Sequence, residues 1–378
     1  MAQILKHLEI SRQLRANITA GRYAANHRLP SESQLVKKFR VSRPTVARAL
    51  RDLQTEGLVK RRAGSGSYVR AGTASPPVPS ARQLGLLIPG LGTTEIFELI
   101  CGELASLARV QDYTLLWGGS AHPRLDMDAS LEHADEICRQ FIERKVSGVF
   151  FAPCELLPEQ DQANRHLAEM LRQAGIPVVL LDRDLQSYPN RSDFDLVGMD
   201  NMAGSYLLTS HLLKLGCRHL YFVSRPHSAP TVDARIVGAR EAMVRRHIEP
   251  SPNWVQLGDP ADLKFIRSLV AARQADAFIC ANDHTAAVLL RSLEAAGVRV
   301  PRDVRVVGFD DVKYATLLSV PLTTIHQPCR DIAVIAFRTM LERIAEPTLP
   351  ARSIMLTPSL VIRESCGAYL PRSAAKKT

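Results

Sequence analysis

Residues 29–69 read LPSESQLVKKFRVSRPTVARALRDLQTEGLVKRRAGSGSYV, and this stretch decides how the N-terminal part of the chain folds. Ser31 and Gln34 have the spacing of a capping box, in which each side chain bonds to the backbone N–H of the other residue. The pair predicts a short helix over residues 32–39. A second helix-forming segment begins a few residues later, so the stretch predicts two helices joined by a tight turn.

The second helix is predicted from its cap and from its apolar spacing. Ser42 is a good N-cap, and Pro44 falls in the first helical turn, where a missing N–H is tolerated. Val46, Leu50 and Leu53 recur at intervals of four and three residues, which places them on one buried stripe. The other faces of this helix are not part of the buried stripe, so they can contact a partner.

A basic hairpin is predicted directly after the second helix. The short apolar runs at residues 58–59 and 67–69 predict two strands, and residues 60–66 between them predict the tip of a β-wing. The tip contains Lys60, Arg61, Arg62 and Gly64. A helix-turn-helix followed by such a wing is a winged helix.

The chemistry of this winged helix suits a DNA duplex. We expect the N-terminal end of the second helix to enter the major groove, and the basic wing to meet the backbone or the minor groove. The alternative is a small helical domain with a solvated basic face, but turn, caps, buried stripe and basic hairpin occur here in one order. The predicted DNA-binding residues are Ser31, Ser42, Arg43, Pro44, Thr45, Arg48, Arg61, Arg62 and Gly64.

The basic charge of the chain is concentrated in the same region. The formal net charge is +10, and residues 1–72 carry 15 Lys+Arg against 4 Asp+Glu, a balance of +11. The remaining residues carry 33 against 34, a balance of −1. A polyanion-binding module at the N-terminus requires this distribution, whereas the larger part of the chain is electrostatically ordinary.

Cysteine usage and hydropathy predict a cytoplasmic protein. The seven cysteines are odd in number and form no C-x-x-C pair, which is typical of scattered buried thiols in a reducing compartment. The N-terminus, MAQILKHLEISRQL, is too polar for a signal peptide, and no run of about 18 apolar residues occurs. We therefore expect no membrane partner.

The chain is predicted to divide into a DNA-binding domain, a linker, a large body and a short disordered tail. Ile10, Leu14 and Ile18 predict a first helix over residues 10–20, and the linker is small and proline-rich. The predicted boundaries are 1–70 for the DNA-binding domain, 71–83 for the linker, 84–366 for the body and 367–378 for the tail.

The body alternates short apolar runs with longer amphipathic segments, which predicts βαβ units and parallel sheets covered on both faces. The runs lie at 85–88, 113–117, 149–151, 178–181, 220–223, 277–280 and 304–307. The helical segments lie at 96–109, 128–144, 164–174, 202–215, 233–246, 262–272 and 284–296. This length exceeds one open sheet, so we expect two α/β lobes whose strand ends define a cleft. The predicted fold class is an α/β multidomain chain, a winged helix-turn-helix joined to a two-lobed parallel α/β domain.

Loops at those strand ends carry polar side chains. Asp182, Asn282 and Asp310 each follow a predicted strand, and Arg235 lies near the start of a helix. Carboxylates, an amide and a guanidinium facing one cleft can hydrogen-bond a polyhydroxylated or other small polar ligand.

The alternative interpretation of the acidic residues is structural, since Asp283 and Asp311 are placed to cap the helices that follow them.

Both parts of the chain resemble known families. The motifs LPSE, VSR-x-TV, EGLV and a GSG wing resemble the winged helix of the gluconate-repressor (GntR) family. Many members of that family carry a base-contacting arginine where this chain has Ala47, followed here by Arg48. The stretches RIVGAREAM, ICANDHTAAVLLRSLEAAGVRVPRDVRVVGFDD and PLTTIHQP resemble the effector-binding domain of the lactose/galactose-repressor (LacI/GalR) family, which is itself similar to type I periplasmic binding proteins. The combination resembles the arabinose-repressor type of regulator.

The second resemblance implies ligand contacts and a path of the chain between the lobes. It implies effector contacts at Asp182, Arg235, Asn282 and Asp310, with Phe97 as an apolar contact. Where many members have an aromatic ring, this chain has Gly258-Asp259-Pro260. It also implies crossings near residues 184–196, 320–327 and 347–354, and a helix at 331–344 that returns to the first lobe.

The implied function is a repressor whose operator binding responds to a small ligand. Expected partners are a pseudo-palindromic DNA operator, a carbohydrate effector and a second copy of the chain, because one winged helix reads only a half-site. A body that senses a nucleobase or another metabolite, or that has no effector, remains an alternative.

An enzyme is the rival class. Some relatives with this head carry an aminotransferase-like body, which needs a Schiff-base lysine. The lysines after the linker lie in no such motif, and no GxSxG, HExxH or Walker sequence occurs. We therefore predict no catalytic residues, no metal and no cofactor. A transport-type binding protein would share the body but lack the basic head.

Overall fold

The chain folds into two compact units, Met1–Ala81 and Arg82–Thr378, here called the head and the body. Their folds are described separately from a computed structural model. The described residues are 6–7, 10–11, 13–14, 17, 23, 27–55, 58–62, 66–69, 82–88, 95–117, 127–156, 160–187, 189–271 and 275–370.

The head contains the predicted helix-turn-helix. Helix α2 (Glu32–Phe39) begins at the predicted capping box: the Ser31 hydroxyl accepts from the Gln34 N–H at 3.3 Å, and the Gln34 side chain accepts from the Ser31 N–H at 2.8 Å. Helix α2 ends at Arg40 in the left-handed conformation (φ 50°), and α3 (Arg43–Thr55) follows at once. The capping-box prediction is confirmed.

The apolar core of the head forms around α3. All three residues of its predicted stripe are at most 1% exposed. Ile10 and Leu14 of the predicted first helix belong to the same core, whereas Ile18 and many neighbours of that segment lie outside the described residues. The stripe therefore holds the N-terminal segment against the second helix.

The wing is an antiparallel pair of strands, β1 (Val59–Arg62) and β2 (Gly66–Val69). The predicted hairpin tip was too long, because residues 60–62 continue the ladder of β1 instead of forming the turn. A third segment, not predicted, adds to β2: the Leu29 N–H donates to Ser67 O and the Val69 N–H to His27 O.

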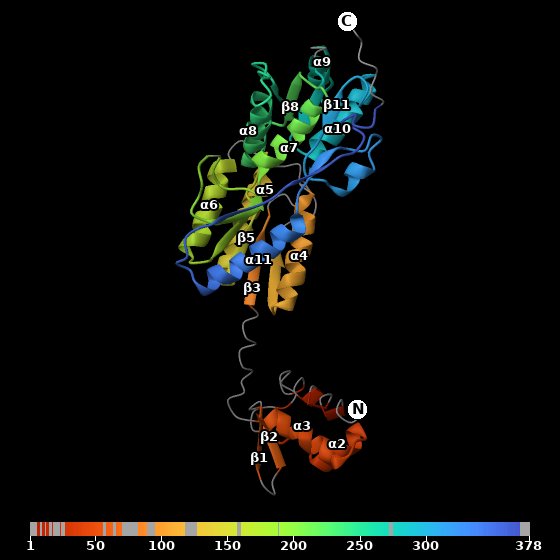
Figure 1. Cartoon of the computed structure of the whole chain (residues 1–378). Coiled ribbons are helices and arrows are strands. Elements are labelled where there is room, and N and C mark those ends of the chain that lie inside the picture. The colour runs from red at the N-terminus through yellow and green to blue at the C-terminus, as the bar shows by residue number, and fades with distance from the viewer. Residues whose placement is uncertain are drawn as a thin grey trace. The chain divides into compact units, whose positions relative to one another are not determined.

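The first lobe of the body is a parallel six-stranded sheet of order β13-β7-β6-β5-β3-β4 (Figure 1). Its strands are β3 (Arg82–Leu87), β4 (Tyr113–Trp117), β5 (Gly148–Phe151), β6 (Val178–Leu181), β7 (Asp195–Met199) and β13 (Ser353–Leu356). Its helices are α4 (Ile96–Val110), α5 (Met127–Glu143), α6 (Gln160–Gln173) and α11 (Cys329–Ala345). One apolar core joins α4 and α11 to the sheet and another joins α5 and α6, so each face is covered.

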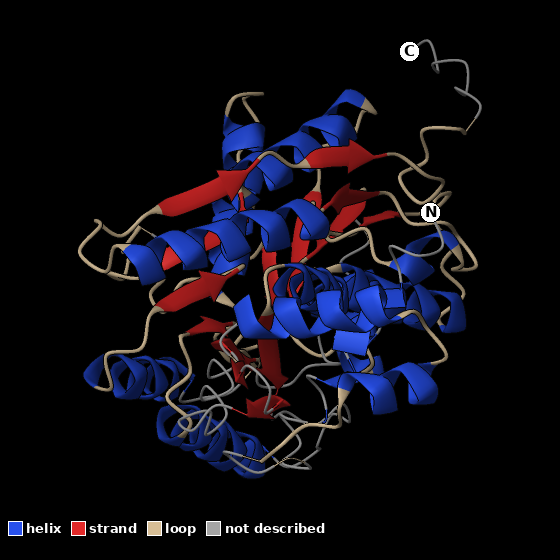
Figure 2. Cartoon of the chain, turned by 90° about the horizontal axis from the view of Figure 1, so that it is seen from below, coloured by secondary structure: helices blue, strands red, loops and turns tan. Residues whose placement is uncertain are grey.

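The second lobe repeats this architecture around a parallel four-stranded sheet of order β11-β10-β8-β9. Its strands are β8 (Leu220–Ser224), β9 (Val255–Leu257), β10 (Ala277–Cys280) and β11 (Arg305–Val307). Its helices are α7 (Asn201–Lys214), α8 (Pro230–Val244), α9 (Leu263–Ala271), α10 (Asp283–Ala295) and the 3-10 turn η1 (Lys313–Thr316). An antiparallel pair, β12 (Thr324–His326) with β14 (Ser359–Val361), packs beside it. Figure 2 shows the strands flanked by helices, as predicted.

The chain passes between the lobes three times, but two of the predicted crossings were wrong. Residues 195–199 form β7 inside the first sheet, so the first crossing comes at Asp200, after the predicted segment 184–196. The third crossing lies between β13 and β14, after the predicted segment 347–354. The second crossing, between β12 and α11, is where it was expected, and α11 returns to the first lobe as predicted.

Two domain boundaries also move by a few residues. Arg82 and Gln83, assigned to the linker, belong to β3. Ala368, assigned to the tail, packs against the core of the second lobe, and the described chain continues to Leu370. The linker at 71–81 and residues 371–378 lie outside the described residues. All seven cysteines are free thiols; six are buried and Cys101 is half-buried.

Helices α7 and α8 pack backbone against backbone, which makes one glycine essential. A Cβ on Gly238 of α8 would overlap the Met202 carbonyl oxygen of α7, whereas a Cβ on Gly102 of α4 would meet nothing within 4 Å. We expect Gly238→Ala to lower the free energy of unfolding by about 1–3 kcal/mol through overpacking. Gly102→Ala should raise it by roughly 0.5–1 kcal/mol, because alanine is the better helix former.

Both tryptophans of the chain, Trp117 and Trp254, lie in the body, so the fluorescence of thermally unfolding full-length protein reports on this unit. A Gly238→Ala variant that melts at the wild-type temperature would contradict the close helix packing.

Candidate DNA-binding surface and effector cleft

Most of the predicted DNA-binding residues of the helix-turn-helix lie at the start of α3 or one turn further along it. Ser42, Arg43, Pro44 and Arg48 are exposed, and Thr45 is half-buried. The hydroxyl groups of Ser42 and Thr45 hydrogen-bond to each other at 2.7 Å. These side chains are therefore accessible to a partner, and their role in DNA binding stays a prediction.

Arg43 already has a partner within the head. Its Nε lies 3.4 Å from a Glu32 carboxylate oxygen, and its side chain is 73% exposed. An exposed ion pair of this kind contributes little to stability, so a DNA phosphate or base edge can replace Glu32 at small cost. Ser31 is also exposed, and its hydroxyl caps α2.

The wing residues are placed only in part. Lys60 is exposed on β1 beside the buried Val59, as strand alternation requires. Arg61 and Arg62 continue β1, and their side chains, like the whole of Gly64, lie outside the described residues.

In the body, the structure brings Asp182, Arg235 and Asp310 together from three elements and two lobes. Asp182 follows β6, Asp310 follows β11 and Arg235 lies in α8; all three are at most 6% exposed. Both aspartates adopt positive φ angles, 68° for Asp182 and 117° for Asp310. Backbone strain of this kind is maintained where a loop must aim a side chain.

Arg235 is fixed by groups from several segments. Its Nε donates to Asn201 Oδ1 at 2.8 Å and an Nη donates to the Ala281 carbonyl at 2.5 Å. The guanidinium lies 3.8 Å from the centroid of the Phe309 ring, and its other Nη is 3.6 Å from Asp310 Oδ1. This last distance is an ion pair without hydrogen-bond contact, and Asp310 Oδ1 has no hydrogen-bond partner among the described residues.

Asp182 is surrounded by residues that the sequence analysis did not assign. Arg183 Nε lies 3.3 Å from Asp182 Oδ2, and the Gln327 amide donates to Asp182 Oδ1 at 3.5 Å. Arg183 also pairs with Glu155 at 2.9 Å. Gln327 is 1% exposed and begins the second crossing. Two sequence features could have indicated these site residues. Arg183 directly follows Asp182, and Gln327 ends the segment PLTTIHQ.

Asn282 combines its predicted position with a structural role. It follows β10 as expected, and its Oδ1 accepts from the Thr285 N–H at 2.8 Å as the N-cap of α10. The capping alternative proposed for Asp283 and Asp311 is wrong. Asp283 accepts from Val312 N–H and the Thr324 hydroxyl, while Asp311 pairs with Arg363 and His326.

Phe97 lies at the start of α4 and is 3% exposed. The centroid of its ring is 5.3 Å from the guanidinium carbon of Arg183, a cation–π distance. The predicted apolar contact is therefore beside the charged cluster and shields it from water.

Burial shifts the ionisation of the cleft carboxylates. Burial raises the pKa of Asp182, and the neighbouring Arg183 and Arg235 partly oppose this rise. The pKa of Asp310 is raised well above its usual value, mainly by burial and further by Asp283, while Arg235 lowers it. Both groups take up protons more readily than exposed aspartates do.

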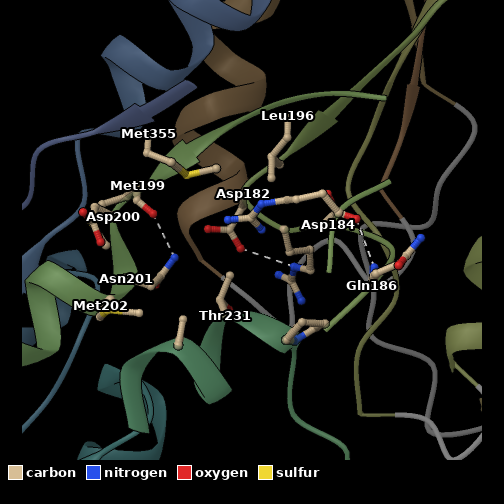
Figure 3. Close-up of a pocket in the computed structure, with 14 residues that line it drawn as sticks. Asp182, Asp184, Gln186, Leu196, Met199, Asp200, Asn201, Met202, Thr231 and Met355 are labelled. Carbon is tan, nitrogen blue, oxygen red and sulfur yellow. Dashed lines mark hydrogen bonds and ion pairs between the residues drawn. The ribbon is translucent and has the colours of Figure 1, made fainter. Parts of the chain in front are cut away.

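A cavity of about 210 Å³ lies beside these residues, between the strand ends of the first lobe and helices α7 and α8 (Figure 3). Asp182, Leu196 and Met355 line it from the first lobe, and Asn201 and Thr231 from the second. Its mixed polar and apolar walls fit a small molecule that touches both lobes.

Further hydrogen bonds join the lobes. The Tyr314 hydroxyl of the second lobe donates to Glu95 of the first at 3.0 Å. The Leu156 N–H donates to the His227 carbonyl at 2.6 Å, and the Gln160 amide to the Ser228 carbonyl at 3.4 Å. The lobes are thus held together by direct bonds beyond the three crossings.

Comparison with known proteins agrees with both units. Residues 6–69 match the family model of bacterial regulatory proteins, gntR family, and residues 209–366 match that of a periplasmic binding protein-like domain. Over 376 residues the chain is 28% identical to the arabinose metabolism transcriptional repressor of Geobacillus stearothermophilus, covering 95% of this chain and 97% of that protein.

Solved structures share the fold of the body. A complex of the transcriptional regulator CelR with cellobiose superposes with a TM-score of 0.64 at 23% identity, covering 86% of this chain and 92% of that one. The lac repressor dimer bound to operator and the anti-inducer ONPF gives 0.59 at 20% identity, covering 75% and 94%.

The chain therefore joins a head that matches the gntR family of bacterial regulatory proteins to a body that matches a periplasmic binding protein-like domain. The family match of the head identifies a bacterial regulatory protein, and the relative that spans 95% of the chain is a transcriptional repressor.

Within the described ranges, no group of three or more His, Cys, Asp or Glu side chains is arranged to hold a metal ion. Across the same part of the chain, no helix has the length and apolar character needed to cross a bilayer.

Asp283 gives the body a measurable pH dependence. Burial raises its pKa to about 7, so the folded state holds a proton that the unfolded state releases near pH 4. Stability contributed by this proton is present at low pH and is lost as pH rises through 7. The free energy of unfolding of wild type, relative to Asp283→Asn, should fall by roughly 1.4 kcal/mol per pH unit between these values.

Chemical denaturation followed by tryptophan fluorescence at pH 5 and pH 8 measures this difference, and Asp262→Asn on the same lobe serves as the control. A wild-type-to-variant difference that stays constant with pH would contradict the raised pKa.

Proposed function

We propose that the chain is a transcriptional repressor whose operator binding is controlled by a small polyhydroxylated ligand, a sugar, held between the two lobes of the body. The observation that carries this proposal is the buried polar cluster of Asp182, Arg235, Asp310 and Gln327, which draws on both lobes and a crossing. Asp310 Oδ1 and Gln327 Oε1 are buried without a hydrogen-bond partner among the described residues. Hydroxyl groups of a ligand supply the missing donors.

The aromatic environment favours a sugar over a nucleobase. The rings beside the cluster belong to Phe97 and Phe309, and each already lies near a guanidinium. Where many members of the LacI/GalR family have an aromatic ring, this chain has Gly258-Asp259-Pro260. A planar base would lack a stacking partner there, whereas hydroxyl groups need only donors and acceptors.

The proposal assigns DNA reading to residues 1–70 and effector binding and dimerisation to the body, residues 82–370. A homodimer places two winged helices on two half-sites of a pseudo-palindromic operator. The lac repressor structure of the same fold is a dimer on its operator, which supports this arrangement. Binding to chromosomal DNA places the protein in the cytoplasm. The function requires no catalytic step and no cofactor.

Base reading and backbone attraction should separate in two variants of the head. An operator is first selected from a randomised duplex pool with wild-type protein. Arg43→Ala should weaken operator binding by about 1–3 kcal/mol while leaving random DNA nearly unaffected, since a base contact is lost. Arg62→Ala should weaken both DNAs alike and flatten the salt dependence, since a phosphate contact is lost. Equal losses on both DNAs for both variants would contradict this division.

The cleft assignment is tested by Asp310→Ala. Its ligand loses a buried carboxylate partner, so the concentration of sugar that releases the operator should rise by roughly 5- to 150-fold, the equivalent of about 1–3 kcal/mol. The head still carries operator binding in this variant. Operator binding is measured against titrated pentoses and hexoses, with Glu249→Ala on the surface of the second lobe as the control. Release of Asp310→Ala at the wild-type concentration would refute the assignment.

A further inference from the structure

We propose that Glu155 makes the cleft selective for uncharged ligands, because it occupies Arg183, the guanidinium that would otherwise receive a phosphate or carboxylate group. This inference rests on the proposed function, since it concerns which ligands the same cleft accepts.

Arg183 is the buried cation of the first lobe at the cavity. It follows Asp182 at the end of β6, is 3% exposed and lines the cavity drawn in Figure 3. Glu155 follows β5, the strand adjacent to β6, and one of its carboxylate oxygens is 2.9 Å from an Arg183 Nη. The Glu155 side chain is 16% exposed. Neighbouring strand ends therefore hold the two groups together.

The charges around the cluster leave no surplus positive charge for an anion. Three carboxylates, on Glu155, Asp182 and Asp310, face two guanidiniums, on Arg183 and Arg235, which gives −1 when all are ionised. Each guanidinium already lies within 4 Å of at least one carboxylate. An anionic ligand would add a further negative charge to this buried set, where screening by water is weak.

An anion that bound Arg183 through two nitrogens would compete with Glu155 for the guanidinium. Guanidinium is the preferred partner of phosphate and carboxylate because it binds them through two parallel N–H bonds. An anion that took this position would leave the Glu155 carboxylate partly buried beside a second negative group. Removing one partner of a buried ion pair is strongly unfavourable. A hydroxyl group, by contrast, can donate to the carboxylates without separating the pair.

The unpaired atoms of the cluster point to the same class of ligand. Among the described residues, Asp310 Oδ1 and Gln327 Oε1 are buried acceptors without a donor, and Arg183 Nε and Nη1 are buried donors at ion-pair distance from carboxylates but without a hydrogen bond. A fully ionised phosphate or carboxylate has no hydrogen to donate, whereas each hydroxyl of a neutral sugar has one. A hydroxyl group can donate to the two acceptors and accept from Arg183, whereas an ionised anion can only accept, so the two unpaired acceptors favour a hydroxyl-bearing ligand.

Arg191 is the other cation that lines the cavity, and it differs from Arg183 in its exposure. Its side chain is exposed at the edge of the cavity, where water solvates the charge. Asp184 and Asp200 line the same cavity, so this outer region is not positively charged overall either. A variant at Arg191 therefore distinguishes attraction of an anion to the edge of the cavity from its exclusion by the buried Glu155–Arg183 pair, which we call the gate.

The experiment compares a neutral sugar with its own phosphate monoester on full-length protein. The sugar is one that releases the operator from wild type, and binding of each compound is measured by isothermal titration and by operator release. We expect wild type to bind the phosphate monoester at least 100-fold more weakly than the sugar. In Glu155→Gln, which keeps the side-chain size and removes the charge, this ratio should fall at least tenfold. Glu143→Gln, exposed on α5, is the matched control and should keep the wild-type ratio.

Each outcome decides between the proposals. Equal affinity of wild type for the sugar and its phosphate overturns the gate while leaving the effector cleft intact. Preference for the sugar that Glu155→Gln does not change, but Arg191→Ala does, also overturns the gate and places selection at the edge. If no compound of the sugar panel binds or releases the operator, the proposed function fails and the gate fails with it. The wild-type comparison needs no variant, so poor folding of Glu155→Gln cannot hide the first result.

Discussion

The cleft of the body depends on keeping charges paired where water is scarce. Asp182, Arg183, Arg235 and Asp310 are each at most 6% exposed, and an isolated charge at such a depth would cost several kcal/mol. Much of the surrounding structure serves this pairing. The left-handed backbone at Asp182 and Asp310 aims the carboxylates, and Asn201, at the first crossing, receives the Nε of Arg235. A loop or crossing of different length would leave one of these charges alone.

Sequence periodicity predicted the elements whose pattern of buried residues can be recognised within the segment itself. The two three-layer lobes follow from apolar runs alternating with amphipathic helices, and the capping box located α2 to the residue. The wrong predictions concern short strands, above all β7, β13 and β14, and hence two crossings. Strands of three to five residues are fixed by partners far along the chain, as when Asp195 on β7 binds Arg343 of α11 and Arg352 beside β13. The sequence near residue 195 does not indicate these distant partners.

The candidate site was predictable to the same extent and for the same reason. Asp182, Arg235 and Asp310 stand out as polar residues at predicted strand ends or helix starts, and the fold brings them together. Glu155 and Gln327 gain their roles only from tertiary neighbours, since one lies four residues beyond β5 and the other in a crossing. Asn282 shows the converse, because a residue chosen as a ligand contact also caps α10. The position of a residue at a strand end indicates where a site lies. The complete set of residues in the site depends on which loops come into contact in the folded chain.

Under the proposed function, the strength of the contacts between the lobes sets how much binding energy a ligand must supply to control DNA binding. Among the described residues, hydrogen bonds of Tyr314, Leu156 and Gln160 join the lobes away from the central cluster. At about 0.5–1.5 kcal/mol each, they favour the joined arrangement by only a few kcal/mol. A ligand shifts such an equilibrium only by its differential affinity, and couplings of about 1–3 kcal/mol are typical of allosteric proteins. Two or three hydroxyl groups that bond to Asp310 and Gln327 only when the lobes are together supply a difference of this size. Lobe contacts much stronger than these would fix the lobes regardless of the ligand, so the proposed control by a small molecule requires lobe contacts of modest strength.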